Sequence, residues 1–188
     1  NKTNTTADSD VYLLDTQQPS QPKLLTAHTG VASHKAATFD PASRQLLLLT
    51  NAGSEFTRLQ AFDLATSVVS ELEKADWDIA YTSFSRDGRY RITGINADAS
   101  TVIRVVDVAT GQPLDLPKLP GGEIRGAVFS GDSQRLAFYV NGDRSPSNLF
   151  SYHLPTKKVQ QLSQSLSREI NPADLKMDTY RASGAGGQ

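Results

Sequence analysis

The chain contains no cysteine, and this absence excludes several kinds of chemistry. Without thiols there can be no disulfide framework, no thiolate nucleophile and no cysteine-ligated zinc or iron–sulfur centre. The compartment stays open, cytoplasmic or periplasmic, because proteins of both compartments occur without cysteine.

An excess of charge of either sign is also lacking. Nineteen Lys and Arg residues face twenty Asp and Glu residues, which leaves a formal net charge of −1 in 188 residues. A basic field for nucleic acid or for an anionic membrane surface is therefore not expected. No apolar run approaches the roughly 20 residues that a membrane-spanning helix needs, and the polar residues 1–10 show no signal-peptide pattern. Neither nucleic acid nor a membrane is expected as a partner.

What the chain does contain is a repeat. Phe39, Phe84 and Phe129 recur at an interval of 45 residues, and each is followed twelve residues later by an asparagine. A polar turn and an apolar run separate each phenylalanine from its asparagine. A period of roughly 40–50 residues with several short strands is typical of β-propeller blades, each a small four-stranded sheet.

This repeat predicts an all-β fold, a partial propeller of about three and a half four-stranded antiparallel blades with a polar C-terminal tail. A half blade is expected at residues 1–29, with a loop at 1–10 and short strands at 11–14 and 23–25. Full blades are expected at 30–76, 77–121 and 122–163, and an exit linker with a flexible tail at 164–188. The expected strands of the three blades are 34–39, 46–50, 57–63 and 67–72; 79–84, 90–95, 101–108 and 113–116; 124–129, 135–140, 149–154 and 159–162.

Turn chemistry supports these boundaries. Asp87-Gly88 lies between two strand patterns, and glycine supplies the positive φ of a tight hairpin turn without steric cost. The four leucines at residues 46–49 do not alternate with polar residues, so that strand is expected to be covered on both faces by neighbouring blades. Fewer blades are present than the roughly 4–8 of a closed ring. Exposed blade edges therefore predict association, including a homo-oligomer.

Several stretches resemble one protein family. Residues 84–90 (FSRDGRY) are similar to the blade motif of TolB-like and prolyl-oligopeptidase propellers, which is widespread. Longer strings resemble blades of bacterial S9-family serine peptidases of the prolyl oligopeptidase and acylaminoacyl-peptidase type. These strings are residues 48–59 (LLTNAGSEFTRL), 62–66 (FDLAT) and 141–150 (NGDRSPSNLF), and residues 167–175 (SREINPADL) resemble the family's link into its hydrolase domain.

The resemblance covers residues 11–175 and implies a non-catalytic role for them. In that family the propeller caps the α/β-hydrolase domain and restricts entry to short unfolded peptides. The implied partners are a hydrolase domain absent from this chain and the peptides that the parent serine peptidase cleaves. After Leu175 the sequence departs from the family pattern. The alternative is a free-standing TolB-like or WD40-like protein-interaction module.

The candidate chemical groups do not form a catalytic pattern. No G-x-S-x-G nucleophile elbow is present, so no catalytic residue is expected. His28 and His34 lie six residues apart without a matched carboxylate, and His153 takes the strand-end position of Asp63 and Asp107, where a structural hydrogen bond is expected. Neither a cofactor nor a metal is therefore expected, and the acidic side chains near the amino end lack a calcium-loop spacing. These are Asp8, Asp10 and Asp15.

Three residues are candidates for contact with a partner domain or a peptide. Trp77 begins the second full blade, where its ring could stack on a peptide, although packing between blades is the commoner use of such a ring. Glu55 and Arg58 lie near the start of a strand, beside a loop that could face a partner domain. An ordinary surface ion pair is the commoner use of such residues.

Overall fold

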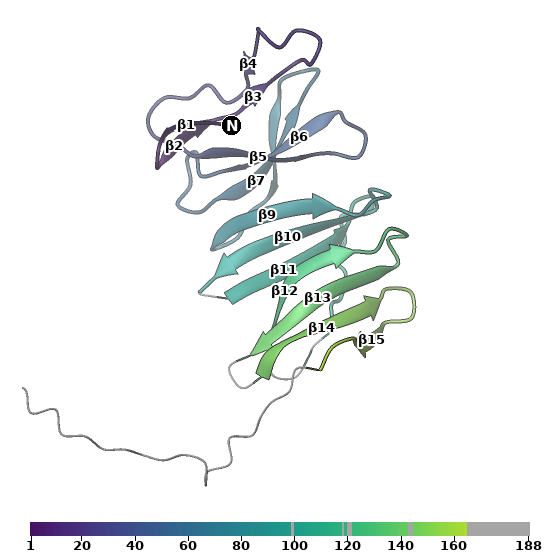
Figure 1. The fold of residues 1–188 in the computed structure, drawn as a ribbon. Coiled ribbons are helices and arrows are strands. Elements are labelled where there is room, and N and C mark those ends of the chain that lie inside the picture. The colour runs from purple at the N-terminus through teal and green to yellow at the C-terminus, as the bar shows by residue number, and fades with distance from the viewer. Residues whose placement is uncertain (99, 118, 120–121, 143–144, 165–188) are drawn as a thin grey trace, which may run out of the picture.

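The computed structural model describes residues 1–98, 100–117, 119, 122–142 and 145–164, and every regular element in this part of the chain is a β-strand. The strands form antiparallel sheets of up to four strands that follow one another through the molecule in sequence order (Figure 1). This arrangement confirms the all-β fold class and the propeller-like stacking of the sheets. Residues 165–188, which hold most of the predicted linker and tail and all of the family-like link at 167–175, lie outside the described residues.

The first four-stranded sheet consists of β5 (His34–Phe39), β6 (Gln45–Thr50), β7 (Arg58–Asp63) and β8 (Val69–Glu73), paired in sequence order. All four leucines of β6 are buried. Two of them face the preceding sheet and two face the following one. The prediction that this strand is covered on both faces is therefore confirmed.

The second sheet has three strands, β9 (Asp78–Phe84), β10 (Tyr90–Ala97) and β11 (Ser100–Asp107). The predicted fourth strand at residues 113–116 is wrong. Only an isolated bridge between Val106 and Pro113 forms, followed by a hydrogen bond from the Leu114 amide to the Val105 carbonyl. Proline has no N–H to donate to a ladder, so it stops strand pairing where it begins.

The third sheet is four-stranded, with β12 (Glu123–Phe129), β13 (Arg135–Gly142), β14 (Ser145–His153) and β15 (Lys158–Gln161). On β13, Leu136, Phe138 and Val140 are buried against the second sheet. Tyr139 points to the other face and is exposed, as is Val128 on β12. Within the described part of the chain, one face of this sheet is therefore packed and the other is open.

The amino-terminal segment forms two short hairpins, β1 (Lys2–Thr5) with β2 (Asp8–Asp10) and β3 (Tyr12–Leu13) with β4 (Lys23–Leu24). The loop predicted for residues 1–10 is wrong, because these polar residues pair through their backbones and give no hydrophobic alternation to detect. The Ser9 amide also donates to the Ala32 carbonyl, which ties the first hairpin to the chain entering β5.

Each interface between successive sheets has its own apolar core. The segments are joined by three clusters rather than by one central core. Val11 packs with Leu46, Leu48 and Phe62 between the amino-terminal segment and the first sheet. The clusters at the next two interfaces are Leu47, Leu49, Leu59, Ile79 and Ile95, then Tyr90, Ile92, Val105, Leu136, Phe138, Val140 and Tyr152.

The hairpin turns repeat with the same 45-residue interval. Ser43, Gly88 and Ser133 occupy equivalent positions, and all three have positive φ, at 56°, 73° and 57°. Glycine is the residue best suited to this conformation, which confirms Asp87-Gly88 as a tight turn. At the next turn of each blade, Asp63 and Asp107 accept backbone hydrogen bonds from the residues that follow them, as expected.

Candidate functional site

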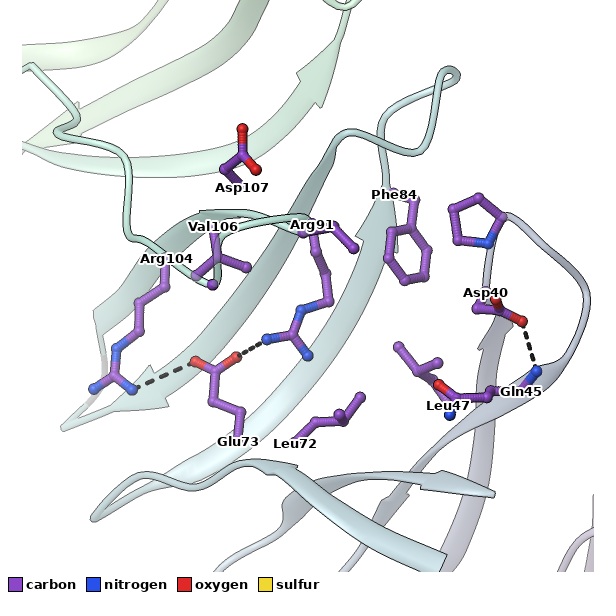
Figure 2. A pocket seen from close by; sticks show the side chains of 13 residues that line it. Asp40, Gln45, Leu47, Leu72, Glu73, Phe84, Arg91, Arg104, Val106 and Asp107 are labelled. Carbon is purple, nitrogen blue, oxygen red and sulfur yellow. Dashed lines mark hydrogen bonds and ion pairs between the residues drawn. The ribbon is translucent and has the colours of Figure 1, made fainter. Parts of the chain in front are cut away.

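A cavity of about 530 Å³ opens between the first and second full sheets. Figure 2 shows Leu47 and Phe84 on one side of it, and the charged side chains of Arg91, Glu73 and Arg104 on the other. Leu47 and Leu72 reach it from the first sheet, whereas Phe84 and Val106 reach it from the second. Residues in turns or at the adjoining strand ends complete its lining: Asp40, Pro41, Gln45, Asp107, Val108 and Gly111.

Glu73 lies at the centre of the charged group, between two arginines (Figure 2). Its Oε2 accepts hydrogen bonds from Arg91 Nη2 at 3.0 Å and from the Thr93 hydroxyl at 2.8 Å. Its Oε1 lies 3.4 Å from Arg104 Nη1. Glu73 comes from β8, whereas its three partners come from β10 and β11, so this carboxylate joins two neighbouring sheets.

The charged groups that line the cavity are the guanidinium groups of Arg91 and Arg104 and the carboxylates of Glu73, Asp40 and Asp107. One carboxylate serves two guanidinium groups, and both Glu73 and Arg91 are largely buried, with side chains 12% and 11% exposed. Burial lowers the pKa of Arg91, opposed by the attraction of Glu73. The second guanidinium that shares this carboxylate, Arg104, is 49% exposed and is therefore partly hydrated.

The two remaining carboxylates of the lining make their hydrogen bonds outside the group around Glu73. Asp40 accepts hydrogen bonds from the backbone amides of Arg44 and Gln45 within its own turn. Asp107 bonds to its own turn and lies 3.3 Å from Arg89 Nε. In Figure 2 the Asp107 carboxylate points away from the cavity.

Sequence reasoning missed Glu73, Arg91 and Arg104. Arg91 and Arg104 follow Glu73 by 18 and 31 positions along the chain, and no motif connects the three residues. Each is a charged residue on a strand, and its sequence context is the same as that of a side chain that faces solvent. Only the stacking of one sheet on the next brings them together.

The three residues singled out from the sequence lie at other places. Glu55 is exposed in the loop between β6 and β7. Arg58, at the start of β7, bonds within its own sheet, with Nη1 lying 2.9 Å from Glu71 Oε2 and Nη2 donating to the Ala52 carbonyl. Arg58 is therefore occupied within the sheet, whereas Glu55 projects into solvent.

Trp77 lies in the loop that leads from β8 to β9 and is 42% exposed. Its ring centroid is 6.0 Å from that of Phe56, with the two planes tilted by 39°. The pair forms an aromatic surface where the loop between β6 and β7 meets the connection between two sheets. A partly exposed aromatic pair offers stacking area to a partner.

Two histidines meet near the amino end. His28 Nε2 lies 2.9 Å from Asp8 Oδ1, and His28 Nδ1 lies 3.3 Å from Asp10 Oδ1. The hydrogen bond to the Thr26 carbonyl and the contact with Asp8 raise the pKa of His28. No matched carboxylate was expected for these histidines, and the first hairpin places two of them against His28. Even so, among the described residues no three His, Asp or Glu side chains are grouped as metal ligands.

The third histidine has a structural role. His153 ends β14, and its Nδ1 lies 2.7 Å from the Thr156 hydroxyl. This contact corresponds to the bond that Asp63 makes with Thr66 in the first sheet. The strand-end hydrogen bond expected for His153 is therefore confirmed.

Comparison with solved structures places the fold among β-propellers. A prolyl endopeptidase, described in connection with inter-domain dynamics in catalysis and specificity, matches 84% of this chain with a TM-score of 0.66 and 19% identity. TolB from Acinetobacter baumannii matches 83% with a TM-score of 0.57 and 19% identity. A proposed TolB from Agrobacterium tumefaciens matches 85% with a TM-score of 0.60 and 14% identity. The chain spans 23%, 38% and 58% of those three chains.

Sequence comparison gives a different and much shorter match. No family model matches the sequence. Peptide chain release factor 2 from Neisseria meningitidis and from Burkholderia pseudomallei is 68% identical to this chain over 28 residues. That stretch is 15% of this chain and 8% of the curated proteins. A match shorter than one blade repeat does not determine the fold or function of the sheets.

The described residues include no helix with the length and apolar character of a membrane span.

Proposed function

We propose that this chain is the non-catalytic propeller part of an S9-type serine peptidase, where it limits access of peptides to a hydrolase domain. The observation that carries the proposal is the likeness of its stacked sheets to a prolyl endopeptidase over 84% of the chain. The sequence adds the blade-like strings and contains no nucleophile elbow. In this proposal the chain excludes large substrates and performs no bond cleavage.

The aromatic surface of Trp77 and Phe56 is the proposed contact with the hydrolase domain or with an entering peptide. Both residues lie in loops at strand ends, where side chains can reach a partner without disturbing sheet packing. Glu55 is exposed in the same loop as Phe56 and can add a charged contact. Arg58 then acts indirectly, by holding that loop through the Ala52 carbonyl.

A free-standing interaction module is the second candidate. The likeness to two TolB structures favours it, because this chain covers 58% of one of them. Its partner would be another protein, bound through the same loop ends or through the open face of the third sheet. The two candidates share a fold and differ in whether a hydrolase domain belongs to the same protein.

A homo-oligomer is part of the proposal. Val128 on β12 and Tyr139 on β13 are exposed on the open face of the third sheet. In the first sheet, β6 takes the position of β13 and is buried on both faces. Covering such a face with a second copy removes apolar surface from water. Light scattering at high micromolar concentration tests this part, and a stable monomer would contradict it.

The catalytic assignment is tested with chromogenic prolyl and aminoacyl peptide substrates. This chain should give no turnover by itself, whereas the protein from which it comes should hydrolyse them if it carries a hydrolase domain. Turnover by this chain that a serine-directed inhibitor abolishes would overturn the non-catalytic role. A source protein without a hydrolase domain would select the interaction module.

The gating role is tested in the source protein with Trp77→Ala, and Val68→Ala serves as the control because Val68 is an exposed residue in a turn of the first sheet. Loss of the aromatic surface should change the ratio of cleavage of short to long peptides, and the control should not. An unchanged ratio in Trp77→Ala would remove this surface from the proposal.

A further inference from the structure

We propose that the cavity between the first and second full sheets binds a small carboxylate attached to an apolar group, with Arg104 and Arg91 holding the carboxylate. The site involves none of the residues assigned above to peptidase gating. The cavity is a local feature of this chain, and its test is independent of the test of the proposed function.

The two guanidinium groups that share Glu73 are the first step. Glu73 accepts bonds from Arg91, Arg104 and Thr93, so its acceptor capacity is largely used. Arg91 uses only Nη2 in a bond within the described part of the chain, which leaves Nε and Nη1 for a ligand. Arg104 makes one long contact of 3.4 Å, so its guanidinium can turn toward an incoming anion.

The apolar walls are the second step. Leu47, Leu72, Phe84 and Val106 line the cavity (Figure 2). An apolar group that enters here is removed from water, at about 25 cal/mol for each Å² of buried surface. The volume of about 530 Å³ lies within the usual range of small-molecule pockets.

Arginine is suited to this role for a geometric reason. Its planar guanidinium presents parallel N–H groups that match the two oxygens of a carboxylate. An apolar wall beside a guanidinium selects a ligand with both properties in one small molecule. Two sources share this chemistry, the free carboxyl end of a peptide with an apolar last residue and a short aliphatic carboxylic acid.

The experiment is calorimetric titration of the whole chain with four probes: N-acetyl-L-leucine, N-acetyl-L-leucinamide, hexanoate and hexanoic amide. The two carboxylates should bind, and each amide should bind at least about tenfold more weakly, because a charge-assisted hydrogen bond is worth about 1.5–3 kcal/mol and about 1.4 kcal/mol corresponds to tenfold. If N-acetyl-L-leucine binds more tightly than hexanoate, the peptide end is the source; the reverse order indicates an aliphatic acid. Equal binding of acid and amide, or no binding at millimolar concentration, would overturn the proposal.

Three variants test the charge argument. Arg104→Gln should weaken carboxylate binding about tenfold, and Arg104 is exposed enough for the fold to tolerate the change. Glu73→Gln should strengthen it, because the competing anion is removed. Arg125→Gln is the matched control, since this exposed arginine of the third sheet bonds to Glu123, which does not line the cavity, and the change should leave binding unchanged.

The outcomes distinguish a local site from a general effect of charge. Equal weakening by Arg125→Gln and Arg104→Gln would attribute binding to the overall field and overturn the proposal. Weakening by Glu73→Gln in a folded variant would make Glu73 a supporting residue and contradict the charge argument. If Glu73→Gln does not fold, the comparison of acid with amide in the unaltered chain still decides.

Discussion

The imidazole rings of His28 and His34 lie with their centroids 4.8 Å apart, yet their surroundings are opposite. His28 contacts the carboxylates of Asp8 and Asp10. His34 is only 7% exposed, and among the described residues neither of its ring nitrogens has a hydrogen-bond partner. Because Asp8 and Asp10 lie on β2 and His34 lies on β5, this histidine pair joins the amino-terminal hairpin to the first sheet.

The histidine pair makes stability depend on pH in two directions. Burial and the nearby His28 lower the pKa of His34, so the stability that its neutral ring provides is lost as pH falls from about 6.5 through the lowered value. The pKa of His28 is raised, so its contribution is complete below about 6.5 and is lost as pH rises through the raised value. We expect stability to decline on both sides of a maximum near neutral pH, measured by urea unfolding from about pH 5 to 8.

Two variants separate the contributions of the pair. His34→Phe should remove the loss of stability on the acid side, because the titrating imidazole is gone. It replaces a buried ring that lacks hydrogen bonds within the described residues by an apolar ring of similar shape, so stability at neutral pH should be unchanged or higher. His28→Gln should flatten the alkaline side. Titration of the two imidazole C–H signals by NMR measures both pKa values, and a His34 value above that of His28 would contradict this account.

The cores between the sheets predict large effects of single substitutions. Leu47 is fully buried between the first and second sheets. Leu47→Ala should lower the free energy of unfolding by about 2–5 kcal/mol through lost burial and a residual cavity. Val68→Ala, at an exposed position, should change it by less than about 0.5 kcal/mol. Similar values for the two variants in urea unfolding would show that this interface is not a packed core.

Gly94 predicts a steric effect without any strain of the backbone. A Cβ added there would lie 2.1 Å from Tyr81 Cε1, on the strand paired with it. Gly94→Ala should cost about 1–3 kcal/mol in unfolding free energy, because the Tyr81 ring must move.

Gly131→Ala is the matched control for Gly94→Ala, since its nearest side-chain atom, Arg86 Nη1, is 3.8 Å from the new Cβ. Adding Tyr81→Leu to Gly94→Ala should recover part of the loss, as a double-mutant cycle measures. An additive cycle would show that the two residues do not clash.

Trp77 is the single tryptophan and reports on the proposed contact surface. Because it is 42% exposed, its fluorescence should be partly quenched by acrylamide. Phe56→Ala should increase the quenching, because it removes the ring beside the indole. A hydrolase domain or peptide that covers this surface should reduce the quenching. If Phe56→Ala leaves the quenching unchanged, the two rings do not shield each other.

Residues that follow the repeat were predictable, and residues that meet across sheets were not. The strands from β5 to β10 could be located because apolar runs and turn residues recur with one period. The hairpin of β1 and β2 escaped prediction because Lys2 and Asp10 pair through backbone groups, which leave no mark on side-chain pattern. The predicted strand at residues 113–116 failed because Pro113 outweighed the apolar residues that follow it.

The candidate site shows the same division. The aromatic residue Trp77 could be noticed in the sequence because single aromatic side chains at strand ends are conspicuous. Glu73, Arg91 and Arg104 could not, since each is an ordinary charged residue until the sheets stack. The shared carboxylate depends on distances between strands, and these distances are not a function of spacing along the chain.

By itself, the sequence determined the all-β class, the blade-like period, the positions of most strands and the lack of cysteine chemistry, because strand periodicity and turn residues act locally. The tertiary structure decided which side chains share a cavity, which histidine is buried and which sheet face stays open. Those outcomes depend on how one sheet packs on the next, and packing brings together residues that no local pattern connects.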